Sequence, residues 1–599
     1  MSETHYIQVE GVNMNPFVLD TEDLSTIRGG GLLLLDAIYD IQKKFFEEDK
    51  DGNGEVISTG ASVGLFLYRG DRGTVEDLVQ EIRAHVAMKY PHATILVECL
   101  TAKPGTFLLD RECLSARIRF AQLMAPSLAV PTVPEGERLR YGREAVAVCG
   151  LDQVRPAAGP PRLMKGSDYA LSPSTRWRRS HGVAKKKRFY AEVLKRDIPG
   201  GEGPLPKLDQ AEFALHFKQI AASRDNWGPL ANKMAVLYLD GNSFSKIQNG
   251  IVRAATDGPS GAEADARATT GLSGEEADAK AIKALRGFDR TVKRYRARFL
   301  RSVLADVLDA GSDDPVWWFR TDRDAPEDAT REDQDEMDAR AANIQSRIRL
   351  ETLLWGGDEI ILVMPAWKGW EVAQKFLDHS ATWEVKKGPK EEAVKLHHAL
   401  GLMFCNHKAP IHRVVGLARA IADHAKKAVG RECSSLACQT LESFDHIGGD
   451  PGARLEELCR PLGADPRRMI LTREGAAALT KHMEALRSER GLPQRQLKRL
   501  VRALFVAGSL EAAKAARADM ELDGTFEKET LTPLLDALET GYPPAPEKKD
   551  QNEDVGEEAD KMSEQKERDR AEANRVIAWY HIEQLWDYVA PRRNGEGRS

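Results

Sequence analysis

The chain has 599 residues, enough for roughly three or four domains, and 42% of them are hydrophobic, which can supply several cores. No apolar run is long enough to span a bilayer and the N-terminus lacks a signal peptide's basic and apolar regions, so we expect a cytoplasmic protein without a membrane contact. The net charge of −6 excludes a uniformly basic surface for nucleic acid, and seven scattered cysteines without a Cys-x-x-Cys pair exclude a disulfide framework.

The first hundred residues switch between strand and helix patterns. A strand is expected from residue 17, an amphipathic helix at about 32–46, two apolar arms around 60–62, a helix at 75–88 and a strand at 93–100. This order predicts one α/β unit of strand, helix, hairpin, helix and strand.

The next region, residues 138–225, differs in composition and reads as a connector rich in Pro, Gly, Ser, Lys and Arg. It includes a basic block at residues 175–190. Two interpretations stay open for this block: a helix face exposed to solvent, which is slightly favoured, or a surface that contacts phosphates.

A second α/β pattern begins with an apolar strand that ends on Asp240 and is followed by a glycine and a helix start at Ser243. A carboxylate at the carboxyl end of a buried strand points into the crevice where ligands bind. Asp240 could instead only cap the following helix by accepting bonds from its free amides.

The acidic, polar and Gly-Ser stretches at about 251–340 flank a helix expected at 281–308, and we interpret this segment as an insertion rather than as core. Two short apolar arms follow, on either side of Gly356 and Gly357, which predicts a hairpin whose turn uses the positive φ open to glycine. Asp358 and Glu359 then lie at its tip. Taken alone, such a tip is usually only a solvated polar turn.

The second pattern continues with a helix at 369–379, a strand near 398–405 and a helix at 411–429 that carries Lys426 near its end. It therefore repeats the order of the first pattern, which predicts two copies of one unit at residues 15–100 and 233–430. The tips are expected to match as Gly60, Ala61 and Ser62 against Gly357, Asp358 and Glu359, so only the second copy has acids at both positions.

The chain ends in helical patterns from about residue 450, followed by a charged tract and an amphipathic segment whose aromatic residues we expect to pack on the protein. The predicted domains are residues 1–137, 138–225, 226–448 with an insertion at about 251–340, 449–545 and 546–599.

An aspartate at a strand end and an Asp-Glu pair on a neighbouring hairpin can hold one or two Mg²⁺ or Mn²⁺ ions, because these ions prefer oxygen ligands. A pair of such ions stabilises the attacking hydroxyl and the pyrophosphate leaving group in nucleotidyl transfer. The two glycines allow close approach of a nucleotide, and Lys426 can neutralise a triphosphate. Judged alone, Lys426 is an ordinary lysine at a helix end.

With these residues, the chain resembles the palm-domain nucleotide polymerases and cyclases, and most closely the large signalling subunit of type III CRISPR effector complexes, the CRISPR polymerase. The family's Asp-Gly-Asp strand motif resembles LYLDGNSFSKI, its Gly-Gly-Asp-Asp hairpin resembles WGGDEIILV, and its proline-started helix resembles NHKAPIHRVVGLARAIADHAKKAV. An inactive palm is indicated by DTEDLSTIRGGGLLLLD and ISTGASVGLFLY.

The resemblance implies an α+β fold with two ferredoxin-like palm domains, the first degenerate and the second of the active type, and a C-terminal helical domain. It implies Asp240, Asp358 and Glu359 as catalytic residues and metal ligands. The nucleotide-binding residues it implies are Gly241, Asn242, Ser243, Phe244, Gly356, Gly357, Lys426, Gly60 and Ser62.

Several positions depart from the family. Asn242 stands where a second strand carboxylate is expected, and Glu359 replaces an aspartate, as in the GGDEF diguanylate cyclases. The family's zinc-knuckle cysteines are replaced by Cys149 followed by Ser172 and Ser174, so we expect no zinc.

The leading hypothesis is a magnesium-dependent nucleotidyltransferase or cyclase that makes a cyclic or linear nucleotide signal in prokaryotic antiviral defence, with ATP, or alternatively GTP, as substrate. RNA or a ribonucleoprotein effector complex is the expected macromolecular partner. Two alternatives stay open: a catalytically weak scaffold subunit that binds RNA or protein, and an enzyme like the diguanylate cyclases.

Overall fold

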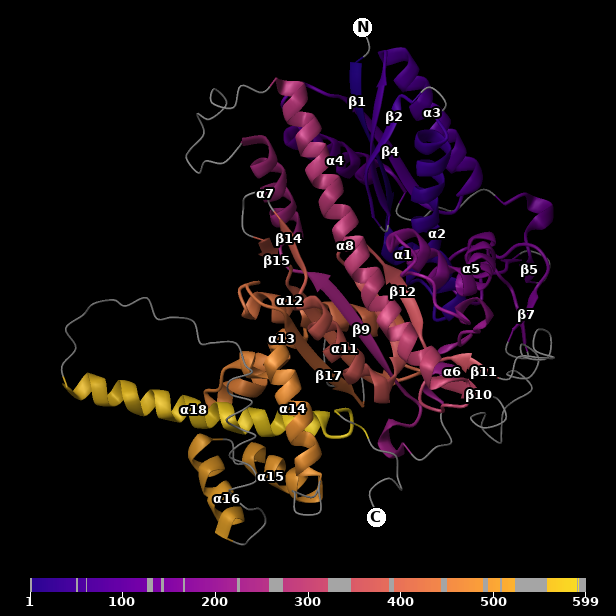
Figure 1. Ribbon diagram of the computed structural model, residues 1–599. Coiled ribbons are helices and arrows are strands. Elements are labelled where there is room, and N and C mark those ends of the chain that lie inside the picture. The colour runs from indigo at the N-terminus through magenta and orange to yellow at the C-terminus, as the bar shows by residue number, and fades with distance from the viewer. Residues whose placement is uncertain are drawn as a thin grey trace.

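The fold is a mixed α+β arrangement of two main sheets flanked by helices, with mostly helices in the C-terminal part (Figure 1). The predicted α+β class is confirmed. No helix in the described ranges is both long and apolar enough to cross a membrane. The computed structural model describes residues 3–49, 52–60, 62–126, 133–141, 145–164, 167–222, 227–257, 273–320, 346–386, 393–442, 450–487, 494–506, 509–522, 557–589 and 591.

The first sheet has four antiparallel strands in the order β2-β3-β1-β4. They are β1 (Glu3–Val12), β2 (Gly54–Thr59), β3 (Val63–Gly70) and β4 (Thr94–Thr101). The helices around it are α1 (Met14–Val18), α2 (Leu24–Ile41), α3 (Arg72–Lys89) and α4 (Phe107–Met124). We call this part the first unit.

The second sheet has six strands in the order β12-β13-β9-β16-β17-β18. They are β9 (Lys233–Gly241), β12 (Glu351–Trp355), β13 (Ile360–Pro365), β16 (His398–Asn406), β17 (Ser435–Leu441) and β18 (Ile470–Leu471). Its helices are α7 (Phe244–Asp257), α8 (Gly274–Ala310), α11 (Ala366–Ser380) and α12 (Ile411–Ala428). This part is the second unit.

The β2–β3 hairpin of the first unit and the β12–β13 hairpin of the second have the same pattern of backbone hydrogen bonds. In each hairpin the glycine amide donates to the carbonyl three residues later, Gly60 to Val63 at 2.6 Å and Gly356 to Glu359 at 2.7 Å. Each first hairpin strand also has a register shift at the same distance before that glycine. Gly60 therefore matches Gly356, and the alignment expected from the sequence, with Gly357, is one residue off. In the corrected alignment Ser62 matches Asp358.

The first strand of the first unit is β1, and the strand expected from residue 17 is wrong because Phe17 lies in helix α1. Strand β1 lies between two neighbours and is buried on both faces, including the polar side chains of His5, Gln8 and Glu10. A strand with polar residues inside gives neither the alternating nor the continuous apolar pattern that marks a strand in a sequence.

The connector contains a 25-residue helix, α5 (Pro173–Asp197), that packs against α2. A Cβ on Gly182 would lie 2.0 Å from the carbonyl oxygen of Ser25, so glycine is required for this close approach. The side chains of Arg178, Arg179 and Lys186 in the basic block are buried rather than on a solvated face. A buried guanidinium needs acceptors, and Arg178 finds them within the chain.

Helix α8 runs alongside both sheets and connects them in space (Figure 1). It falls inside the segment expected to be an insertion, yet Phe299, Leu300 and Leu304 lie in the largest core. An apolar stripe of this length must be covered, which explains why the helix packs into the protein. Residues 258–272 and 321–340 of that segment lie outside the described residues.

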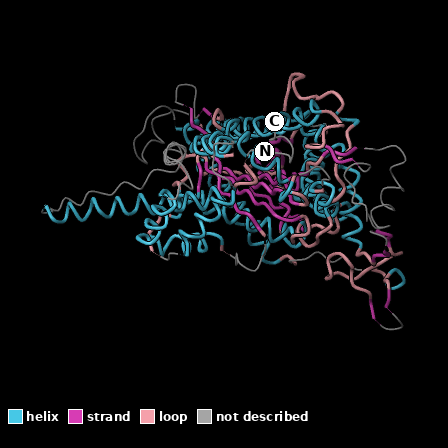
Figure 2. Tube along the Cα trace, turned by 90° about the horizontal axis from the view of Figure 1, so that it is seen from below, coloured by secondary structure: helices cyan, strands magenta, loops and turns pink. Residues whose placement is uncertain are grey.

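The C-terminal helices pack below the second sheet in Figure 1, and Figure 2 shows the strands running through the middle of the molecule with helices around them. As expected, the last aromatic residues pack on the protein, since Trp579 is buried and Tyr588 stacks on Phe404 at 4.1 Å between ring centroids. The helices are α13 (Pro451–Cys459), α14 (Arg473–Leu486), α15 (Gln494–Val506), α16 (Leu510–Leu522) and α18 (Glu557–Leu585).

Other short elements include α6 (Phe217–Ala221) and strands β5 (Arg140–Tyr141), β6 (Ala145–Val146), β7 (Arg162–Met164), β8 (Ser167–Tyr169), β10 (Trp318–Arg320), β11 (Ser346–Ile348), β14 (Glu384–Lys386) and β15 (Ala393–Lys395).

Candidate active site

The carboxylate of Asp240 lies at the end of β9, in the interior of the second sheet, and is only 13% exposed. Lys426, on α12, donates to Asp240 Oδ2 at 2.5 Å and to the carbonyl oxygen of Gly241 at 2.9 Å. Sequence reasoning placed Lys426 near a phosphate, whereas here its ammonium neutralises the carboxylate. The structure therefore brings these two predicted residues into direct contact.

Burial raises the pKa of Asp240 above its ordinary value, and the hydrogen bond from Lys426 opposes that shift. The charges of Asp358 and Glu359 raise the same pKa further. The carboxylate of Asp240 is therefore close enough to the hairpin tip to be affected by the charges of Asp358 and Glu359. Such crowding of negative charge favours a counter-cation, which in this structure is Lys426.

The hairpin tip that carries Asp358 and Glu359 is tight for a reason that differs from the expected one. Gly356 and Gly357 have no positive φ. A Cβ on Gly356 would lie 2.7 Å from the carbonyl oxygen of Glu359, whereas a Cβ on Gly357 would meet open space. Glycine is therefore required at position 356, where the backbone lies close to the carbonyl of Glu359. At position 357 there is room for a side chain.

The carboxylate of Glu359 is held on the α12 side of the sheet. Tyr238 donates to Glu359 Oε1 at 2.8 Å, and Arg419 of α12 donates to Oε2 at 3.4 Å. Burial, reinforced by the charges of Glu359 and Asp240, raises the pKa of Tyr238, so the hydroxyl keeps its proton and can donate.

The turn after β9 is built around Asn242, whose side chain is buried. Asn242 donates through its amide nitrogen to the carbonyl oxygen of Cys433 at 3.1 Å, while its buried Oδ1 has no hydrogen-bond partner. Ser243 has a left-handed backbone with φ 57° and starts helix α7. Phe244 is buried against Gly241, where a Cβ would lie 2.6 Å from its ring.

The predicted magnesium site would be built from Asp240, Asp358 and Glu359. Within the described ranges, no three or more His, Cys, Asp or Glu side chains are grouped so that they could hold a metal ion. Asp240 is engaged by Lys426 and Glu359 by Tyr238 and Arg419, so the magnesium site stays a prediction. The oxygen donors still suit the ion, because carboxylates and the unpartnered Oδ1 of Asn242 are hard ligands.

The predicted first-unit residues Gly60 and Ser62 lie in the β2–β3 hairpin. Ser62 accepts a bond from the amide of Gly11 at 2.7 Å. The adjacent Thr59 receives a bond from Lys293 of α8 at 2.8 Å, which links this hairpin to the second unit.

No protein-family model and no curated protein sequence matches the chain. Its fold is similar to solved structures of Csm1. Csm1 of T. onnurineus matches over 98% of this chain and 70% of its own, with a TM-score of 0.46 and 13% identity. A Csm1-Csm4 cassette in complex with pppApApA matches over the same shares, with a TM-score of 0.44 and 12% identity.

A Csm1-Csm4 cassette in complex with cA4 matches over 78% of this chain, with a TM-score of 0.37 and 13% identity, and there this chain spans 58% of the matched chain. Another match is the Csm1-Csm4 subcomplex of the type III-A CRISPR-Csm interference complex. The resemblance expected from the sequence is confirmed to this extent. At these TM-scores the functional conclusion has to come from the residues of this chain.

Sequence reasoning missed Tyr238 and Arg419, which hold Glu359. A signal was present for each: Tyr238 precedes Asp240 by two residues and so shares its face of the strand, and Arg419 precedes Lys426 by two helical turns. It also missed Arg296 of α8, whose buried guanidinium lies over the Trp355 ring at the end of β12, 5.5 Å from the ring centroid. No local pattern marks that residue.

Proposed function

We propose that this chain is a nucleotidyltransferase or nucleotide cyclase of the palm type, with its active site in the second unit. The observation that supports the proposal is the pairing of Leu239 with Ile360, which brings the end of β9, with Asp240, beside the hairpin tip that carries Asp358 and Glu359. The charges of Asp358 and Glu359 add to the effect of burial in raising the pKa of Asp240, as expected for neighbouring carboxylates. The first unit is the degenerate palm in this proposal.

When bound, magnesium would supply charge neutralisation for the attacking hydroxyl and for the leaving pyrophosphate. Asp240 and Asp358 would hold it, with Asn242 Oδ1 as a neutral donor. Tyr238 and Arg419 fix the Glu359 carboxylate beside them. Lys426, which donates to Asp240 in this structure, would then be released to neutralise phosphate charge.

We infer ATP as the substrate to test first, with GTP as the alternative. Matched structures include Csm1-Csm4 cassettes in complex with one ATP and with pppApA. A nucleotide signal made in antiviral defence, cyclic or linear, and assembly into a CRISPR effector complex are part of this proposal.

The experiment is a turnover assay with labelled ATP or GTP, with magnesium or EDTA, and with and without RNA. We expect a phosphodiester product that requires magnesium and disappears in Asp358→Ala. A matched control is Asp378→Ala, an acid on α11 that pairs with Arg473. Full activity of Asp358→Ala, or activity in EDTA, would overturn the proposal.

A second candidate is a scaffold subunit without turnover. The pairing of Lys426 with Asp240 and the uncharged Asn242 favour it, because both lower the demand for a cation at this site. Absence of product under every condition, together with retained RNA or protein binding, would establish this alternative.

A further inference from the structure

Helix α4 of the first unit carries a group of exposed apolar side chains. In the part of the chain that the structure describes, seven large apolar side chains are exposed, and four of them lie on α4: Leu109, Phe120, Leu123 and Met124. Single exposed apolar residues are common on protein surfaces, whereas a contiguous group of them marks a contact with another molecule. The grouping on one helix therefore indicates a contact surface.

The exposed side chains form a row along the whole helix. Its members are separated by four, three, four and three residues, and all of them are exposed: Leu109, Cys113, Ala116, Phe120 and Leu123. This spacing places them on one side of an α-helix and is the spacing of the contact positions in a pair of packed helices. We call these five residues the α4 row.

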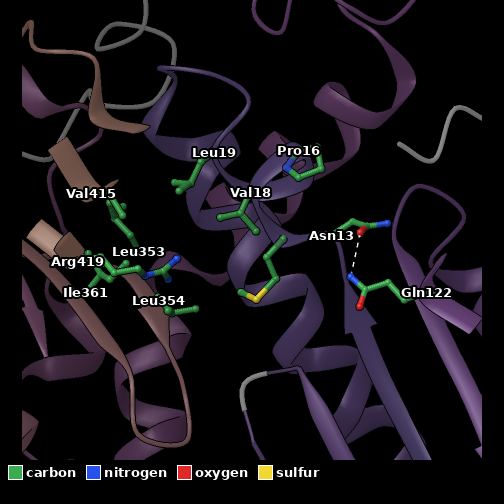
Figure 3. Close-up of a pocket in the computed structure, with 11 residues that line it drawn as sticks. Asn13, Pro16, Val18, Leu19, Gln122, Leu353, Leu354, Ile361, Val415 and Arg419 are labelled. Carbon is green, nitrogen blue, oxygen red and sulfur yellow. Dashed lines mark hydrogen bonds between the residues drawn. The ribbon is translucent and has the colours of Figure 1, made fainter. Parts of the chain in front are cut away.

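The other sides of α4 are fixed to the rest of the chain. Leu114 is fully buried in a core with residues of the first sheet. Arg111 donates to Asn249 Oδ1 of α7 at 2.6 Å. Near the end of the helix, Gln122 donates to Asn13 Oδ1 at 3.2 Å (Figure 3). The α4 row is therefore held in place before any contact forms, which lowers the entropic cost of docking.

Two charged residues on one edge of the α4 row favour a second copy of the chain as the occupant. Glu112 and Arg119 stand seven residues apart, so they lie on the same edge. When two identical helices pack antiparallel, the two-fold axis between them places equivalent edges side by side. Glu112 of each copy then meets Arg119 of the other, which gives two ion pairs in one interface.

Both charges are available for such a contact. Glu112 is exposed and forms no ion pair with any residue that the structure describes. Arg119 pairs with Glu10 at 3.0 Å, yet its side chain is 65% exposed and a guanidinium has five donors. Arg117, on the other edge of the α4 row, donates to the carbonyl oxygen of Cys99 at 2.7 Å, which directs it toward its own sheet.

We propose that the α4 row is the contact surface of a homodimer, in which the α4 helices of two copies pack antiparallel. Pairing Glu112 with Arg119 places the two-fold axis between residues 115 and 116, beside Ala116. Phe120 of one copy then lies between Leu109 and Cys113 of the other. Such a contact buries roughly 1,000 Å² in total, at the lower end of specific interfaces, so we expect dissociation at micromolar concentration.

The test is sedimentation velocity of the full chain over a concentration range of about 1–100 µM. Phe120→Glu places a carboxylate in the α4 row, and Glu112→Arg sets two arginines against each other across the interface. The matched control is Met88→Glu on α3, because Met88 is 77% exposed and α3 packs on the other face of the first sheet. All three residues are exposed, so each variant should keep the melting temperature of the unsubstituted chain.

Cys113 supplies a second readout. All seven cysteines lie in the described part of the chain, and only Cys113 is exposed. A short bismaleimide should therefore link two copies through Cys113, and the linked product should disappear in Cys113→Ser and in Phe120→Glu.

We expect a mass that rises toward twice that of one chain as the concentration increases. The dissociation constant should rise at least about tenfold in Phe120→Glu and about threefold in Glu112→Arg, and stay unchanged in Met88→Glu. A monomer at every concentration would overturn the inference and assign the α4 row to a different protein. A dimer that Met88→Glu weakens as much as Phe120→Glu, or one that the bismaleimide does not link, would also overturn it.

Discussion

Glu10 occupies in the first sheet the position that Asp240 occupies in the second. Glu10 follows Val9, which pairs with Gly64, and Asp240 follows Leu239, which pairs with Ile360. Gly64 and Ile360 each stand four residues after the hairpin glycine of their unit. Each carboxylate meets a basic side chain from the helix that follows the fourth strand of its unit: Arg119 lies 3.0 Å from Glu10, and Lys426 lies 2.5 Å from Asp240. The units differ instead at the hairpin tip.

Two matching ion pairs connect the two units. Arg28 of α2 donates to Glu351 of β12 at 2.7 Å, and Arg286 of α8 donates to Glu55 of β2 at 2.8 Å. Both glutamates stand five residues before the hairpin glycine. An arginine of each unit therefore forms an ion pair with a glutamate on the first hairpin strand of the other unit. The pair of Arg28 with Glu351 is fully buried.

The buried pair of Arg28 and Glu351 predicts a large stability loss when one partner is removed. Arg28→Met leaves the Glu351 carboxylate buried without its partner, which costs about 3–5 kcal/mol. The control is Arg72→Met, which breaks the exposed pair of Arg72 with Glu76 and costs under about 0.5 kcal/mol. Urea midpoints followed by tryptophan fluorescence measure both. Equal losses of unfolding free energy in the two variants would contradict a stabilising role for the buried pair of Arg28 and Glu351.

Glycines on two helices predict opposite effects of alanine. Gly182→Ala forces the backbones of α5 and α2 apart, so we expect a strongly lowered melting temperature. Gly287→Ala on α8 meets open space and should stabilise the helix by about 0.5–1 kcal/mol. Differential scanning calorimetry compares them. A stabilising Gly182→Ala would mean that the two helices do not pack as described.

His398 predicts an acid-sensitive contribution to stability. Burial, followed by the charges of His397, Arg296 and Lys426, lowers the pKa of His398 to about 3. In the unfolded chain a histidine takes up its proton near pH 6.5, so the unfolded state binds more protons between these values and stability falls as the pH drops through this window. The limiting slope is about 1.4 kcal/mol per pH unit.

His398→Leu should therefore flatten the dependence of the urea midpoint on pH between about 6.5 and 4. The exposed His412→Leu on α12 serves as the control. If the urea midpoint of His398→Leu depends on pH as steeply as that of the unsubstituted chain, the pKa of His398 is not lowered by folding.

The sequence was sufficient to predict the helices and strands whose hydrophobic patterns lie within one short segment. The hairpin with Asp358 and Glu359, the strand ending on Asp240 and the helix with Lys426 are all found where they were expected. Strand β1 was not predicted, because its buried polar residues interrupt the apolar pattern that marks a strand. The hairpin alignment was off by one residue, since it depends on backbone bonds rather than on side chains.

Pairs between distant segments could not be predicted. Arg28 and Glu351 are 323 residues apart, and nothing in either local pattern names the other. The same holds for Arg419 and Glu359, whose contact depends on how α12 packs against the sheet. Such contacts follow from tertiary packing, which a periodicity argument does not contain.

In the proposed function, the second unit and not the first performs the chemistry. The most direct measurement is the rate of magnesium-dependent product formation from labelled ATP or GTP in two matched variants, Asp240→Asn and Glu10→Gln. We expect Asp240→Asn to lose activity by at least about a hundredfold, because one ligand charge is removed. Glu10→Gln should keep the rate of the unsubstituted chain. Equal rates in the two variants, or loss of activity only in Glu10→Gln, would contradict an active site in the second unit.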